Sequence, residues 1–357
     1  MMTENTTFFL GANTPFGFHS LFRELYDPAD GWRAYILKGG PGTGKSTFMK
    51  TVAARCEEAG VGYETIRCAS DPNSLDAVRI ESKKICIADG TAPHVLEPKC
   101  PGAVETVLDL SAFWDEAVLR ENRGEILRLF AENASAHRKC VRFLQAAESL
   151  SRDVRRIALG CTDTDKLERY ASRYASRTFG VPRGIVGREL TRFLSAVTPD
   201  GIFIHRDTLD ALCDDVLVIE DPYGAVSAAL LSCLRRYALG AGLDVIVCPC
   251  PLHPDAGPQD LFVPQLRLGI VTENAFRRFD GTSKVHASRF TDAAAMRSHR
   301  SRITFSRRTE KELVEEAVSA CADALEIHNE LETYYKRAMD YDAVTRLAEK
   351  TAAEVLA

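Results

Sequence analysis

The chain has 357 residues, of which 45% are hydrophobic and 27% charged, and its formal net charge is −5 at pH 7. This composition is typical of a globular protein long enough for two domains, and the slightly acidic balance argues against nucleic acid as a main partner. No apolar run approaches the roughly 18 residues of a membrane helix and residues 1–18 lack a signal-peptide pattern, so we expect a cytoplasmic protein with no membrane span.

The first strongly patterned segment is a strand, a glycine-rich loop and a helix. Residues 33–38 (RAYILK) alternate into an apolar strand, and residues 46–58 place apolar side chains on one helical face before Gly60 ends the helix. Between them, GGPGTGKS matches the pattern of a phosphate-binding loop, or P-loop. The alternative is a glycine-rich turn that matches by chance, and the flanking strand and helix argue against it.

The residue types of this loop suit a nucleoside triphosphate. Glycines let the backbone turn so that successive N–H groups and the helix N-terminus face phosphate oxygens. Lys45 would bring a mobile charge to the β- and γ-phosphates, and the Ser46 hydroxyl would bind Mg²⁺, so the predicted cofactors are ATP and Mg²⁺. The predicted nucleotide-binding residues are Gly39, Gly40, Pro41, Gly42, Thr43, Gly44, Lys45, Ser46 and Thr47.

A magnesium ion also needs an acidic ligand at the end of a neighbouring strand. The segment KKICIADG, from Lys83 to Gly90, has a continuous apolar run that predicts a buried parallel strand. Asp89 follows this run at the edge where ligands bind in open α/β sheets. We therefore predict Ser46 and Asp89 as the metal ligands. The alternative is that Asp89 only begins a turn.

Asp71 and His94 follow predicted strands and complete the catalytic candidates. Residues 63–68 indicate a strand, after which Asp71 would contact Mg²⁺, substrate or an attacking water, or else begin a turn before a proline. His94 lies in the loop after Asp89, where it would approach a phosphate or substrate, or else serve the structure alone. Together with Lys45 and Asp89, they are the predicted catalytic residues.

Two patterns that would add chemistry are missing from the sequence. Gly90 stands where many ATP-hydrolysing proteins carry a glutamate after the metal-binding aspartate, so the general base is unassigned. The 11 cysteines include no C-x-x-C pair. We therefore expect cysteines to be small buried side chains and expect no zinc site.

The second half of the chain repeats the first at an offset of 182–184 residues. Four segments recur in the same order, which indicates an internal duplication. They pair Leu10–Phe18 with Leu194–Ile202, Tyr35–Gly42 with Leu217–Gly224, Gly60–Cys68 with Gly242–Cys250, and Lys83–Gly90 with Arg267–Asn274.

The repeated loop has lost the residues that bind phosphate. Ser227 stands at the position of Lys45, and an alanine follows it at the position of the magnesium-binding serine. Glu220 and Asp221 precede it, and their negative charge would repel a triphosphate. We therefore expect the second copy to keep the fold without the catalytic function.

Each copy also predicts a long amphipathic helix, within residues 125–159 and 313–341. We expect these helices to pack on each other or on their own sheet, with a coiled-coil dimer seam as the alternative. The basic stretch 296–308 is interpreted as a solvated connector before the last helix. The predicted fold is α/β, with duplicated P-loop NTPase-type parallel sheet domains at residues 1–185 and 186–357.

The chain resembles a family of uncharacterised bacterial ATPases built from tandem P-loop domains. The stretches that carry this resemblance are GANTPFGF, LKGGPGTGKST, SDPNSLD, IADGTAPHVLEP and PGAV, which cover most of the first copy. The resemblance implies ATP binding by Gly39–Thr47 and a role for Asp89 and His94. A second P-loop, which such proteins can hold, is absent here. A weaker likeness is to recombinase-type ATPases.

The leading functional prediction is an ATPase or ATP-dependent switch with one active site. Arg120, Arg123, Arg277 and Arg278 are candidates for an arginine that stabilises the transition state, or are solvated surface charges. The alternatives are a small-molecule kinase and a nucleotide-sensing interaction protein that does not hydrolyse. No guanine-reading N-K-x-D motif is present, which favours adenine. A protein partner or a homo-oligomer fits either the switch or the sensor.

Overall fold

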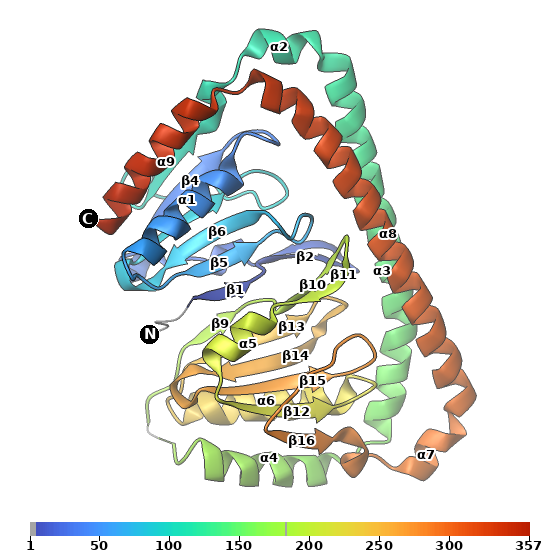
Figure 1. The fold of residues 1–357 in the computed structure, drawn as a ribbon. Coiled ribbons are helices and arrows are strands. Elements are labelled where there is room, and N and C mark those ends of the chain that lie inside the picture. The colour runs from blue at the N-terminus through green and yellow to red at the C-terminus, as the bar shows by residue number, and fades with distance from the viewer. Residues whose placement is uncertain (1–4, 183) are drawn as a thin grey trace.

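The computed structural model describes residues 5–182 and 184–357. Residues 1–18 were expected to hold no signal peptide, and residues 1–4 of this stretch lie outside the described residues. The described residues form two six-stranded sheets, covered by helices and flanked by two long helices (Figure 1). The prediction of an α/β fold is confirmed. Within this part of the chain, none of the helices is both long enough and apolar enough to cross a bilayer.

The first sheet has the strand order β1-β5-β6-β7-β4-β8. The central strands β4 and β7 are buried on both faces because nearly all their side chains are apolar. α1 (Lys45–Glu58) covers one face with Phe48, Met49 and Val52. The strands are β1 (Thr6–Phe8), β4 (Arg33–Lys38), β5 (Glu64–Arg67), β6 (Leu75–Ile80), β7 (Ile85–Asp89) and β8 (Glu105–Asp109).

The second sheet repeats this order as β9-β13-β14-β15-β12-β16. α6 (Ala225–Gly240) covers it as α1 covers the first sheet, and the short helix α5 (Arg206–Leu212) contacts β15 and β1. The strands are β9 (Glu189–Thr191), β12 (Asp215–Glu220), β13 (Val245–Cys250), β14 (His253–Val263), β15 (Leu268–Glu273) and β16 (Ser283–His286). The strand order is therefore the same in the two halves.

Both sheets are mixed, whereas the sequence predicted parallel sheets. β6 runs antiparallel to β5 and β7, and β14 runs antiparallel to β13 and β15. The connections between these strands are short, and a short connection can only reverse the chain, because a parallel pair needs a crossover of about a dozen residues or more. The repeat of strand order is observed, but a duplication of P-loop domains stays a prediction.

The two halves meet around an approximate twofold axis. Phe9 and Phe193 exchange both of their backbone hydrogen bonds, each at 2.9 Å. Such a reciprocal contact is what twofold symmetry produces when equivalent residues meet. On each side of this contact lies a two-stranded hairpin, formed by β2 (Gly11–Thr14) with β3 (Gly17–Ser20) and by β10 (Ser195–Thr198) with β11 (Gly201–Ile204).

The two long helices, α3 (Arg123–Gly160) and α8 (Arg300–Ala338), pack on each other in antiparallel orientation along one side of the molecule (Figure 1). Ion pairs join Arg128 to Glu330 at one end and Asp153 to Arg302 at the other. Buried cysteine, alanine and leucine side chains line the contact. The prediction that these helices pack on each other is confirmed, and the helix pair forms within one chain.

The boundaries of the second long helix differ from the prediction. α8 begins at Arg300, so the basic stretch expected to be a connector belongs largely to α7 (Ala293–Ser298) and α8. α8 ends at Ala338 because the Asp340 side chain caps a separate helix, accepting a hydrogen bond from Ala343 N. In the first half, the short helix α2 (Glu116–Glu121) precedes α3 as α7 precedes α8.

The last helix of each half covers the sheet of the other half. α4 (Thr164–Thr178) packs on the second sheet beside α6, with Leu167 and Ala171 in that core. α9 (Tyr341–Leu356) packs on the first sheet beside α1, with Val344 and Ala348 in that core (Figure 1). The predicted division at residues 185 and 186 separates the two sheets, but the packing of both halves crosses it.

Candidate functional site

The glycine-rich loop connects the end of β4 to the start of α1, as the sequence predicts. Gly44 is the N-cap of α1 with φ of 89°, and Gly42 has φ of 66°. Both values lie in the left-handed region, which glycine adopts without steric cost. The loop therefore turns around the N-terminus of α1, where backbone N–H groups and the helix dipole favour an anion.

Lys45 points back into the loop. Its Nζ donates hydrogen bonds to the carbonyl oxygens of Gly39 (2.9 Å) and Gly40 (2.7 Å). It also lies 3.6 Å from Asp89 Oδ2, and the two side chains are 11% and 13% exposed. The structure therefore brings together two of the predicted catalytic residues, in a setting where solvent screens their charges only partly.

Asp89 and Ser46 are the predicted metal ligands. Asp89 ends β7, which pairs directly with β4, and its Oδ1 accepts hydrogen bonds from the N–H and the hydroxyl of Thr91. Ser46 Oγ accepts a hydrogen bond from Leu75 N at 3.0 Å. A hydroxyl has two lone pairs, so Ser46 keeps one for a cation, and Asp89 Oδ2 supplies a carboxylate oxygen. This donor set suits Mg²⁺.

The second half of the chain covers the loop. A Cβ atom at Gly40 would lie 2.6 Å from the Tyr335 ring, and one at Gly42 would lie 3.1 Å from the Glu332 carbonyl oxygen. The Tyr341 hydroxyl donates a hydrogen bond to the Gly42 carbonyl at 2.5 Å. The close approach of α8 therefore leaves little room for a side chain at Gly40 and Gly42. No sequence pattern indicated that α8 and α9 would cover this loop.

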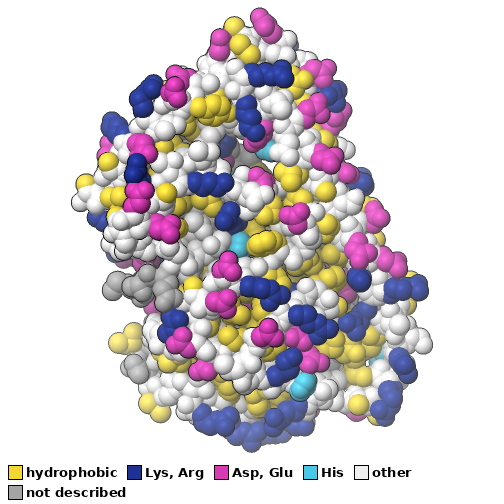
Figure 2. Space-filling view, in the orientation of Figure 1, with side chains coloured by type: hydrophobic (Ala, Val, Ile, Leu, Met, Phe, Trp, Pro, Cys, Tyr) yellow, Lys and Arg dark blue, Asp and Glu magenta, His cyan; other side chains and the backbone are white. Residues whose placement is uncertain are grey.

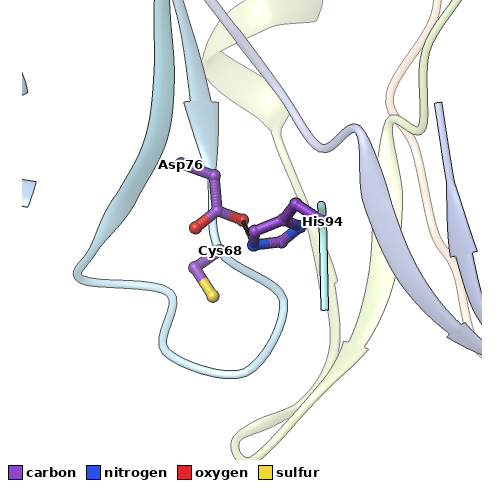
Figure 3. Close-up of side chains that lie close together, drawn as sticks. All are labelled: Cys68, Asp76 and His94. Atoms are coloured by element: carbon purple, nitrogen blue, oxygen red, sulfur yellow. Dashed lines mark ion pairs between the residues drawn. The ribbon is translucent and has the colours of Figure 1, made fainter. Parts of the chain in front are cut away.

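His94 is part of a buried cluster next to the loop. Its Nε2 lies 3.1 Å from Asp76 Oδ2, and the Cys68 thiol completes a group whose ligand atoms all lie within 4.8 Å of one another (Figure 3). Asp76 raises the pKa of His94 despite the opposing effect of burial. Burial and Asp76 raise the pKa of the Cys68 thiol well above its usual value. His94 packs between the rings of Phe18 and Phe22.

This cluster was not predicted, because its three residues lie on separate segments without a recognisable spacing. Cys68 follows β5, Asp76 lies on β6, and His94 lies in the loop after β7. Imidazole, carboxylate and thiolate groups are all ligands of transition metals. However, the Cys68 thiol would have to lose its proton in a buried setting that favours the neutral form.

Asp71 begins a turn, which was the alternative to a role at the metal or the substrate. Its Oδ1 accepts a hydrogen bond from Asn73 N at 3.1 Å, and its Oδ2 accepts one from the Ser74 hydroxyl at 2.5 Å. Its hydrogen bond to Glu332 raises the pKa of Lys336 of α8, and the negative charge of Asp71 adds to this effect. Lys336 also forms an ion pair with Glu332 at 2.6 Å.

Three of the four arginine candidates already have acidic partners. Arg277 pairs with Asp260 at 2.8 Å, and both side chains are 1% exposed. Arg278 pairs with Glu273 at 2.7 Å, and Arg120 pairs with Glu116 within α2. The remaining candidate, Arg123, is exposed at the start of α3. Lys336, which no sequence pattern indicated, pairs with Glu332, the residue of α8 that approaches Gly42.

In the second half, a carboxylate occupies the loop that corresponds to the glycine-rich loop of the first half. Asp221 is completely buried, and its Oδ2 accepts hydrogen bonds from the N–H (2.8 Å) and hydroxyl (3.1 Å) of Ser227. Its Oδ1 accepts a hydrogen bond from Tyr223 N at 3.0 Å. The protein's own anion therefore takes the N–H groups at the start of α6 that a phosphate would need.

On the face shown in Figure 2, acidic and basic side chains are intermixed, and a band of basic side chains runs along the edge where α4 lies. Lys166, Arg169, Arg173 and Arg177 belong to α4.

Comparison with known proteins gave no family assignment: no family model, curated protein or solved structure matches this chain.

Proposed function

We propose that the protein binds Mg·ATP at the Gly39–Thr47 loop and acts as an ATPase or ATP-dependent switch with one nucleotide site. The observation that carries this proposal is the buried arrangement of Lys45 and Asp89, 3.6 Å apart at the junction of the loop, β7 and α1. A basic and an acidic group at the N-terminus of a helix suit a phosphate and its cation. The resemblance to tandem P-loop ATPases supports the same proposal.

Each group of the site has a role in this proposal. The loop N–H groups bind phosphate oxygens, and Lys45 neutralises charge on the β- and γ-phosphates. Ser46 Oγ and Asp89 Oδ2 hold Mg²⁺, which would neutralise developing charge during phosphoryl transfer. Such a reaction depends mainly on positioning and charge, so a site without an assigned general base is compatible with slow hydrolysis.

Nucleotide binding requires local movement in this proposal. Lys45 Nζ must leave the carbonyl oxygens of Gly39 and Gly40, because these hydrogen bonds use N–H donors that the phosphate oxygens would need. Glu332 and Tyr341 lie against the same loop, so a bound phosphate would be sensed by α8 and α9. This contact favours a switch over a simple hydrolase.

The first experiment measures thermal unfolding and phosphate release with Mg·ATP for the wild type, Lys45→Ala, Asp89→Asn and Lys50→Ala. Lys50 is the control because it lies on the same helix, and its Nζ bonds to the exposed Asn73 carbonyl. ATP at about 100 times its Kd should stabilise the wild type and Lys50→Ala by about 2.7 kcal/mol. Lys45→Ala should lose this stabilisation, because it removes the mobile positive charge.

The outcomes separate the three candidate functions. Phosphate release that is lost in Lys45→Ala and Asp89→Asn supports an ATPase. ATP binding without release supports a sensor, or a kinase that needs an acceptor. Unchanged ATP affinity in Lys45→Ala would refute the nucleotide site, because no other described lysine side chain lies within the loop.

A further inference from the structure

A cavity of about 240 Å³ opens beside the first turn of α6 in the second half. It lies at the loop that corresponds to the nucleotide loop of the first half, and Pro222, Tyr223 and Gly224 of that loop are among its lining residues. α3 contributes Val154 and Arg155, α6 contributes Ala228, and the loop after β15 contributes Phe276 and Arg277. The cavity is therefore a site distinct from the one proposed for ATP.

Arg277 lines this cavity and has hydrogen-bond donors without partners. Its side chain is 1% exposed, and its Nη2 is held by Asp260 at 2.8 Å. Its Nε and Nη1 are buried and have no hydrogen-bond partner among the described residues. Buried donors without partners are uncommon in folded proteins because they lose their hydrogen bonds to water. A ligand with acceptor atoms would satisfy them.

Arg155 of α3 also lines this cavity. Its Nη2 lies 3.2 Å from Glu148 Oε1, whereas its Nη1 is buried without a partner among the described residues. In the first half, the helix residue that approaches the loop is Glu332 at Gly42, whereas here Arg155 approaches the equivalent Gly224. The helix residue at this position is therefore a glutamate in the first half and an arginine in the second.

The rest of the lining adds positive charge and apolar surface. Arg307, Arg308 and Lys311 of α8 lie at the cavity with a single carboxylate, Glu310, among the lining residues that the structure describes. Apolar atoms come from Val154, Ile202, Ala228, Leu252 and Phe276. A ligand that matches this lining carries an anionic group and an apolar body.

The buried carboxamide of Gln259 adds a requirement for the ligand, because its oxygen needs a hydrogen-bond donor. Gln259 lines the cavity, and its buried Oε1 receives no hydrogen bond from the described residues. A triphosphate does not fit the adjacent loop, because the Asp221 carboxylate already takes the N–H groups there. The ligand therefore has one oxyanion and, in addition, a hydrogen-bond donor.

We propose that this cavity binds a small organic oxyanion, a carboxylate or a monophosphate, whose head group is held by Arg277 and Arg155 and whose body lies against Val154, Ile202 and Phe276. The donor group of the ligand bonds to Gln259. The site does not depend on nucleotide binding in the first half, and its ligand shares neither loop nor metal with that site.

The test is calorimetric titration of the full chain with 4-hydroxybenzoate and phenyl phosphate, with phenol as the uncharged control. Arg155→Ala removes one head-group contact and should weaken binding about tenfold or more. Arg152→Ala is the matched control, since Arg152 also pairs with Glu148 but does not line this cavity. Ala228→Leu should block binding by filling the cavity while retaining every charge.

The variants make the proposal falsifiable even if one of them misfolds. Tight binding of either anion to wild type and Arg152→Ala, with loss in Arg155→Ala or Ala228→Leu, supports the site, and the preferred anion identifies the head group. Loss of anion binding in Lys45→Ala would overturn it, because the anion would then occupy the first-half loop. Phenol binding as tightly as both anions, or no binding by either anion up to about 10 mM, would also overturn it.

Discussion

At the scale of single residues, His205 is held in a setting that opposes its charge. It is buried against the rings of Phe9 and Phe203, and its Nε2 has no hydrogen-bond partner among the described residues. Burial, and secondarily the charge of Arg67, lowers its pKa from 6.5 to about 3. At the corresponding place in the first half stands Leu21, whose N–H makes the same backbone bond as that of His205.

This setting predicts an acid-sensitive fold. The unfolded chain takes up a proton on His205 below about pH 6.5 while the folded chain does not, so stability falls as the pH decreases from 6.5 toward 3. At pH 5 this effect amounts to about 2 kcal/mol. His205→Leu should remove it, which is measured by urea unfolding of both proteins at pH 7.5 and 5. An equal loss of stability in the two proteins between these pH values would contradict the prediction.

At the scale of elements, the loop before α6 is stabilised by its own carboxylate. Asp221 accepts three hydrogen bonds from this loop and helix start, where a P-loop would hold phosphate. The contrast with the first half depends on few substitutions, since Ser227 replaces the lysine and Asp221 replaces a glycine. A loop of the same course is therefore a proposed ligand site in the first half and a structural cap in the second.

Asp221→Ala should lower the free energy of unfolding by about 1–3 kcal/mol, because it leaves buried N–H groups unpaired. The matched control is Asp292→Ala, which removes an exposed cap of α7 and should cost about 1 kcal/mol or less. Urea unfolding followed by circular dichroism measures both changes. A smaller effect for Asp221→Ala than for the exposed cap would show that the carboxylate is not structurally important.

At the scale of the whole molecule, each sheet depends on a helix from the opposite half. Val344 of α9 is 4% exposed and belongs to the same core as Phe48 and Ile87 of the first half. The molecule is therefore held together by reciprocal helix packing as well as by the pair α3 and α8. This arrangement predicts that damage at one end of the chain affects structure at the other.

Val344→Asp places an unpaired charge in this core and should lower the free energy of unfolding by about 3 kcal/mol or more. Thr345→Asp is the control, because Thr345 follows Val344 on the same helix but its side chain is exposed. Amide hydrogen exchange should show faster exchange in β4 and α1 of Val344→Asp. Exchange that accelerates only in α9 would mean that the first sheet does not depend on that helix.

Local sequence signals predicted the strand, loop and helix around Lys45, because the apolar run, the glycines and the helix stop at Gly60 are all contiguous. They also predicted the long helices from their apolar periodicity. The packing of α4 and α9 on the sheet of the opposite half was not predictable, since an apolar helix face does not specify which sheet it covers. For the same reason, the approach of Glu332 to Gly42 and the pairing of Asp76 with His94 had no sequence signal.

The exchange of terminal helices has a consequence for the order of events during synthesis. The strands of the first sheet lie within residues 6–109, but the helix that covers one of its faces lies within residues 341–356. The apolar face formed by α1 and its sheet therefore stays exposed to water until more than 200 further residues have been made. The nascent chain must keep this face from aggregating for many seconds, at synthesis rates of about 5–20 residues per second.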